Sequence, residues 1–147
     1  MNIQLGQYAG FCFGVDRAVS MVEEAAKAGG TVVTLGPIIH NHHVVDRFQR
    51  MGVEVANSPE EVRPGSTVVL RAHGVPRQVE ETLAGLPVQV VDATCPFVKR
   101  IHRLVQEAEA EGRTPVIIGT RTHPEVVGIA SWCRRGMVFE GPEELER

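Results

Sequence analysis

The sequence predicts an α/β fold in which short, mainly parallel strands alternate with helices. Apolar, β-branched runs recur along the chain, and a turn marked by Gly or Pro follows most of them. Apolar residues at helical spacing then follow each turn. Such βα units are typical of a parallel sheet covered by helices. The 147 residues suffice for one complete small domain plus part of a second.

The first half of the chain predicts four strands. Three of them lead through a turn into a helix, whereas the third in order leads only to a brief helical turn before the fourth strand begins. A brief helical turn should follow Ser58, because Pro59 suits a first helical position and Glu61 completes a capping pattern. The predicted strands are Asn2–Tyr8, Thr31–Leu35, Val53–Ala56 and Thr67–Leu70, and the helices are residues 15–26, a segment with the stripe Val44, Val45, Phe48 and Met51, and a segment from about Pro76.

The second half repeats the pattern of strand, turn and helix and predicts a second domain that is cut short. Thr122 predicts the cap of one helix. The segment from Pro142 to Leu145 begins another helix without continuing it. We therefore expect residues 1–95 to form the first α/β domain and residues 96–147 to form part of a second. The predicted strands are Val88–Val91, Pro115–Gly119 and Val138–Phe139, and the helix after Pro96 carries the stripe Val98, Ile101, Leu104, Val105 and Ala108.

Composition and charge exclude several classes of function. Fifteen Lys and Arg stand against 18 Asp and Glu, the net charge is -3, and no basic run occurs, so nucleic acid is not an expected partner. No segment approaches the ~18 apolar residues of a membrane span, and the first residues do not read as a signal peptide. We therefore expect a cytoplasmic protein without a membrane partner. Three cysteines without a secretion signal favour reduced thiols over disulfides.

Reactive side chains occupy the turns at which predicted strands give way to helices. Cys12 and Cys95 precede helices, whose dipoles and free N–H groups stabilise a thiolate for nucleophilic or metal-ligating chemistry. Two small buried thiols are the structural alternative. His40 and His73 lie in comparable turns and suit an anion such as phosphate or diphosphate. Because parallel strands place such turns on one edge of a sheet, these groups should meet around one cavity.

Glu125 follows His123 at another predicted helix start. If it faces the same cavity, its carboxyl group can donate or relay a proton, although an acidic residue at this position also suits the helix dipole. Cys133 follows a predicted helix, on the opposite rim, and is expected to be a structural or surface thiol. Local polar, solvent or packing roles are expected for Asp16, Arg17, His42, His43 and His102.

Five motifs stand in order along the chain: Gly10-Phe11-Cys12-Phe13-Gly14-Val15-Asp16-Arg17-Ala18, Gly36-Pro37-Ile38-Ile39-His40-Asn41, Arg71-Ala72-His73-Gly74-Val75-Pro76, Asp92-Ala93-Thr94-Cys95-Pro96 and His123-Pro124-Glu125-Val126. Together they resemble the 4-hydroxy-3-methylbut-2-enyl diphosphate reductase family. The resemblance spans essentially the whole chain but only about the N-terminal half of the family's usual length.

The resemblance implies an iron–sulfur reductase of the methylerythritol phosphate pathway. Such an enzyme removes the hydroxyl group of an allylic diphosphate to give isopentenyl and dimethylallyl diphosphates, with electrons from a ferredoxin or flavodoxin. It implies a [4Fe-4S] cluster held by three cysteines. The third cysteine belongs to a C-terminal region outside this chain, and Cys133 does not match its motif. By resemblance the cluster ligands are Cys12 and Cys95, the diphosphate ligands are His40, His73 and His123, and the proton donor is Glu125.

Two other classes of function also fit parts of the pattern. A truncated, non-redox module would use the histidine turns to bind diphosphate alone. A mononuclear zinc hydrolase would use His, Cys and Glu ligands, but no short ligand spacing such as His-Glu-x-x-His supports it.

Overall fold

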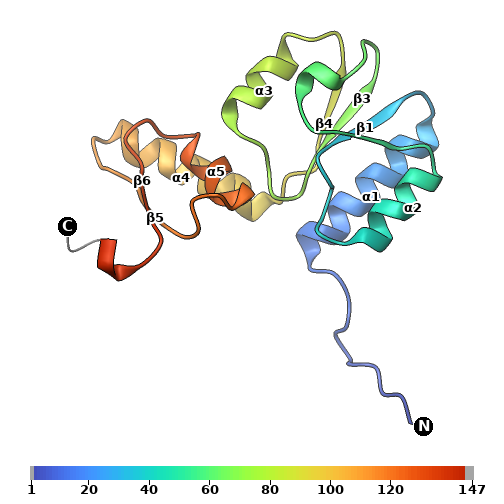
Figure 1. Cartoon of the computed structure of the whole chain (residues 1–147), viewed down its shortest axis with the longest axis horizontal. Coiled ribbons are helices and arrows are strands. Elements are labelled where there is room, and N and C mark those ends of the chain that lie inside the picture. The colour runs from blue at the N-terminus through green and yellow to red at the C-terminus, as the bar shows by residue number, and fades with distance from the viewer. Residues whose placement is uncertain (1, 145–147) are drawn as a thin grey trace.

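The computed structural model describes residues 2–144 and has the predicted α/β fold with parallel strands (Figure 1). Leu145, which the sequence analysis includes in the last helix start, lies outside the described residues. A four-stranded parallel sheet has the order β2-β1-β3-β4, and a separate sheet pairs β5 with β6. The strands are β1 (Val32–Leu35), β2 (Glu54–Ala56), β3 (Thr67–Leu70), β4 (Gln89–Asp92), β5 (Val116–Ile118) and β6 (Met137–Phe139).

Helices lie where the apolar spacing predicts them, although the first of them follows no strand. The helices of residues 13–28 and 42–50 pack on one face of the four-stranded sheet. The helix of residues 77–84 and the short 3-10 helix of residues 59–61 pack on the other face. The remaining helices lie beside β5 and β6, to the left in Figure 1. The helices are α1 (Phe13–Ala28), α2 (His42–Arg50), η1 (Pro59–Glu61), α3 (Arg77–Ala84), α4 (Pro96–Ala110), α5 (Pro124–Ala130) and η2 (Pro142–Glu144).

The core forms because β1 and β3 are apolar on both faces. Val69 packs against α1 and α2, whereas its neighbours Val68 and Leu70 pack against α3 and η1. Adjacent residues of a strand point to opposite faces, so a run of buried β-branched residues needs a covering layer on each side. The result is a sheet between two layers of helices.

The chain leaves the neighbouring strands β1 and β3 in opposite directions. From β1 it passes through α2 to β2, and from β3 it passes through α3 to β4 on the other side. Such a switch point opens a crevice at the carboxyl ends of the two strands. The turn after β1 carries His40, and the turn after β3 carries His73. A hydrogen bond of 3.2 Å from the Ala72 N–H to the Ile38 carbonyl joins the two turns.

Three details of the prediction are wrong. Residues 2–8 form no strand and are exposed, because within the described chain no strand pairs with them. Met51 ends α2 instead of extending its buried stripe. On α4 only Val98 and His102 are buried, whereas Ile101 and Leu104 face outward, because α4 packs through a narrow contact with α5.

No helix between residues 2 and 144 has the length and apolar character needed to span a membrane.

Val68 and Val90 offer a matched test of this layered core, since they are register partners on β3 and β4. Val68 is fully buried, whereas Val90 is 41% exposed. We expect V68A to lower the free energy of unfolding by about 2 kcal/mol, because it removes buried methyl groups. V90A should change it by less than about 0.5 kcal/mol. Urea unfolding measures both, and equal effects would contradict a core between the helix layers.

Candidate functional site

The predicted site residues lie at the starts of helices. Cys12, Cys95 and His123 are the N-cap residues of α1, α4 and α5. His40 directly precedes Asn41, the N-cap of α2, whose Oδ1 accepts a hydrogen bond of 3.4 Å from the Val44 N–H. The first N–H groups of a helix have no partner within it, and the helix dipole is positive there. These helix starts therefore favour negatively charged groups.

The switch point brings two of the predicted histidines together. The ring centroids of His40 and His73 are 4.8 Å apart, although 33 residues separate them in sequence. His123 and Glu125 lie close enough to influence the charge of the His73 ring. We call His40, His73, His123 and Glu125 the histidine cluster. It gathers three imidazoles and one carboxyl group from three different turns.

The charge of His73 is set by this arrangement. Burial lowers the pKa of the imidazole below its ordinary value, and the neighbouring His40 lowers it further. The Glu125 carboxylate opposes this effect because it stabilises the imidazolium, whereas Arg71 and His123 again lower the pKa. The free cluster therefore favours neutral His73, and an arriving anion would favour its protonation.

His123 caps α5 with its own side chain. Its Nδ1 accepts a hydrogen bond of 3.2 Å from the Glu125 N–H, so the cap is His123 and not Thr122 as predicted. Because Nδ1 accepts, the neutral imidazole carries its proton on Nε2. The ring can thus donate a hydrogen bond to an anion without becoming charged.

The two predicted cysteine ligands occupy adjoining helix starts. A Cβ atom built at Gly14, in the first turn of α1, would lie 2.5 Å from Cys95 Sγ, so α1 and Cys95 pack closely. Cys95 also touches the turn of His73, because its N–H donates a hydrogen bond of 2.9 Å to the Ala72 carbonyl. Cys12 is exposed, Cys95 is half-buried, and both are free thiols. Cys95 therefore links the start of α1 to the histidine cluster.

Arg17 does not make the local contact that the sequence suggests. Its guanidinium donates hydrogen bonds to the carbonyls of Thr94, at 3.2 Å, and Asp92, at 3.4 Å. Asp92 in turn accepts a hydrogen bond of 2.9 Å from the Thr94 N–H and pairs with Lys99. The loop that presents Cys95 is thus held by α1, by its own aspartate and by α4.

The thiols alone do not make a metal site. Across residues 2–144, no group of three or more His, Cys, Asp or Glu side chains is placed to hold a metal ion. Cys133 points its sulfur to the Ala130 carbonyl at 3.7 Å, and burial raises the pKa of its thiol. Among the described residues, Cys12 and Cys95 are thus two free thiols at adjoining helix starts that do not form a metal site by themselves.

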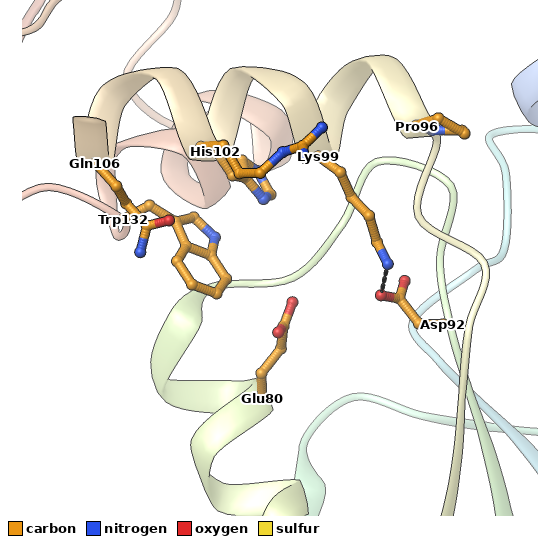
Figure 2. Close-up of a pocket in the computed structure, with 8 residues that line it drawn as sticks. Glu80, Asp92, Pro96, Lys99, His102, Gln106 and Trp132 are labelled. Carbon is orange, nitrogen blue, oxygen red and sulfur yellow. Dashed lines mark ion pairs between the residues drawn. The ribbon is translucent and has the colours of Figure 1, made fainter. Parts of the chain in front are cut away.

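A cavity of about 400 Å³ lies between α3 and α4 (Figure 2). Glu80 projects into it from α3, and burial raises the pKa of this carboxyl group. For Asp92, burial acts in the same direction, but hydrogen bonds from Lys99 and Thr94 prevail and lower its pKa. Lys99 and Asp92 form the ion pair drawn in Figure 2. None of the predicted site residues lines this cavity.

Sequence reasoning missed the groups that support the site. Arg17 contacts a loop 77 positions away, a partnership that no local pattern signals. Arg71 is half-buried beside the cluster, where its Nε donates a hydrogen bond of 3.0 Å to the Gly74 carbonyl. The adjacent Gly74 is the available signal, because its positive φ of 76° marks a turn that favours glycine, and its carbonyl accepts the hydrogen bond from Arg71.

The pKa of His73 tests the geometry of the cluster. A titration followed by NMR of the ring protons should give a midpoint below the ordinary value of 6.5. E125Q should lower it further, because the substitution removes the one neighbouring charge that stabilises the imidazolium. E24Q is the control, since Glu24 lies near the amino ends of β3 and β4. An unchanged or higher midpoint in E125Q would contradict the placement of Glu125.

Gly14 tests the contact between α1 and Cys95. Alanine is the better helix former, so helix propensity alone would make G14A more stable. We instead expect the free energy of unfolding to fall by roughly 1–3 kcal/mol, because the new methyl group overlaps Cys95 Sγ. G10A is the control, since nothing lies within 4 Å of its added Cβ. Urea unfolding that showed a more stable G14A would argue against this contact.

The chain matches the model of the LytB protein family over residues 3–147. Among curated relatives, the 4-hydroxy-3-methylbut-2-enyl diphosphate reductase of Aquifex aeolicus is 43% identical over 150 residues, which cover 99% of this chain and 52% of the relative. The enzyme of the same name from Geobacter sulfurreducens is 46% identical over 142 residues, which cover 97% of this chain and 48% of the relative.

Two solved structures agree with these relatives. One, described as (E)-4-hydroxy-3-methyl-but-2-enyl diphosphate reductase, aligns with a TM-score of 0.85 and 43% identity over 97% of this chain and 52% of its own. The E-1-hydroxy-2-methyl-but-2-enyl-4-diphosphate reductase from Plasmodium falciparum aligns with a TM-score of 0.90 and 28% identity over 96% and 45%. The chain spans about half the length of these proteins, and it belongs to the LytB protein family.

Proposed function

We propose that this chain supplies the diphosphate-binding half of a LytB-type reductase. The reaction would convert 4-hydroxy-3-methylbut-2-enyl diphosphate to isopentenyl and dimethylallyl diphosphates. The pairing of His40 and His73 at the switch point, 4.8 Å apart, is the observation that carries the proposal. The named relatives support it, because they are reductases of this diphosphate. We place the domain boundary between Cys95 and Pro96.

The diphosphate would bind at the histidine cluster. Its negative charge would meet His40 and His73, the Nε2–H of His123 and the free N–H groups at the helix starts. Binding would raise the pKa of His73, which burial lowers in the free chain, so the imidazolium would form when the anion arrives. The cluster would thereby match its charge to that of the substrate.

Glu125 would deliver a proton to the departing hydroxyl group. The carboxyl group is half-buried, lies close to His73 and sits on the first turn of α5, which His123 caps. The conversion breaks one C–O bond, forms one C–H bond, consumes two electrons and two protons, and releases water. In this role Glu125 is the general acid for the proton that leaves in that water. A ferredoxin or flavodoxin of the cytoplasm would supply the electrons.

Cys12 and Cys95 would hold two positions of a [4Fe-4S] cluster. Both are free thiols and the N-cap residues of helices, and cysteine thiolates are the usual ligands of such clusters. When bound, the cluster would supply electrons and a Lewis-acidic iron. The third thiolate would come from the part of the family's length that lies outside the match.

Anaerobic reconstitution tests this proposal. The chain is mixed with the C-terminal half of the Aquifex aeolicus relative, and iron, sulfide and a reductant are added. Iron content, electron paramagnetic resonance and turnover of the allylic diphosphate are then measured. We expect C12S and C95S to lose the cluster signal and at least roughly 10- to 100-fold in turnover. C133S is the matched control and should keep both.

The same experiment can reject the proposal. Absence of both cluster and product in the complemented wild-type chain would do so. Equal losses in C133S, C12S and C95S would also count against it, because the sulfur of Cys133 lies against the Ala130 carbonyl and Gly136 and is not one of the proposed ligands. If a cluster forms but no product does, the result would support Cys12 and Cys95 as cluster ligands and would reject the proposed substrate.

A further inference from the structure

His102 is buried within α4, although no part of the proposed chemistry uses it. The residue is 5% exposed, and its ring stacks on Trp132 with centroids 5.4 Å apart and ring planes inclined by 22°. Figure 2 shows both side chains at the cavity between α3 and α4. The ring is therefore held in one orientation from that side.

Two glycines leave space for the His102 ring on its other sides. A Cβ atom at Gly74 would lie 3.0 Å from His102 Cε1 and 3.2 Å from Thr94 Cγ2. A Cβ atom at Gly128 would lie 3.8 Å from His102 Nε2 and 4.0 Å from the His73 carbonyl oxygen. Gly74 follows His73, and Thr94 precedes Cys95. Gly128 lies on α5, the helix that begins after His123 and carries Glu125.

The imidazole thus adjoins two of the segments that present the site, the turn of His73 and the helix of Glu125. The third segment, the Cys95 loop, leads directly into α4, which carries His102, and its Thr94 side chain lies against the same Gly74. Its Nε2 has no hydrogen-bond partner among the described residues, and a buried polar atom without a partner is disfavoured. An apolar side chain would fill the same space without that disadvantage. Packing of a core alone therefore does not explain a histidine here.

We propose that His102 is a positioning residue, which holds the turn of His73, the Cys95 loop and α5 in the arrangement that binds the diphosphate. The effect on binding rests on the proposed function, because it presumes that the histidine cluster takes this anion. His102 itself would not touch the ligand, since its ring lies behind Gly74 and Gly128. Its removal would let the three segments shift independently.

Calorimetric titration of the whole chain with inorganic diphosphate tests the proposal. We expect H102A to weaken binding roughly tenfold or more, because small displacements of converging groups reduce their joint effect. H102L keeps most of the volume, so it remains informative if H102A does not fold. It should weaken binding in the same direction, because a branched side chain does not reproduce the flat ring that stacks on Trp132 and lies against Gly74 and Gly128. Q106A is the control on the same helix, since Gln106 lines the cavity one turn away.

Histidine ring signals in NMR spectra give a readout that a loss of general stability would not produce. In folded H102A or H102L, the signals of His73 and His123 should shift, whereas those of the exposed His42 and His43 should stay in place. Q106A should leave all of them unchanged. Wild-type affinity together with unmoved His73 and His123 signals would overturn the proposal, as would equal shifts at all four rings.

The design also separates this proposal from the proposed function. If the wild-type chain binds no diphosphate, and H40A is indistinguishable from it, the binding role of the histidine cluster fails. The ring signals still decide whether His102 positions His73 and His123. If the wild-type chain binds and H40A does not, while H102A binds normally with unmoved signals, only the positioning role is rejected.

Discussion

The parallel pairing of β1 with β3 is the constraint on which the site depends. Leu35 and Leu70 are register partners at the carboxyl ends of these strands, so the turns that follow begin side by side. The connections then diverge, through α2 on one face and α3 on the other, which opens a crevice between the turns. His40 and His73 meet there because the backbone of the sheet brings them together.

The surroundings of Cys95 show how the rest of the molecule builds on that pairing. Its N–H is bonded to the Ala72 carbonyl in the turn after β3, its sulfur rests against Gly14 of α1, and Arg17 holds the preceding loop. Contacts from two elements far apart in sequence thus fix one thiol. A reactive group held by its supporting residues needs little reorganisation when a ligand arrives. We therefore expect the Cys95 loop to move little if the proposed ligand binds.

The sequence predicted most of the fold because its apolar periods are clear. β3 was placed at its observed bounds, and α1 has the predicted buried positions Ala18, Val19 and Val22. The prediction of a strand at Asn2–Tyr8 is wrong, because the alternation of apolar and polar residues cannot reveal whether a neighbouring strand is available to pair with it. For the site, the positions of the turns are predictable from the sequence, and the structure brings His40 and His73 together. The chemistry assigned to these residues stays a prediction. The support from Arg17 and His102 was not predictable, because it depends on contacts between elements distant in sequence.

The small sheet of β5 and β6 has a different consequence. Within residues 2–144 it contains two strands, and the apolar side chains of Val116, Ile118 and Met137 are 53%, 71% and 46% exposed. A sheet of two strands with so little burial has few contacts to oppose its opening. Local unfolding should therefore begin at β5 and β6, and amide hydrogens there should exchange with solvent sooner than those of the buried strands β1 and β3. The molecule would thus combine a stable unit around the histidine turns with a neighbouring unit of much lower local stability.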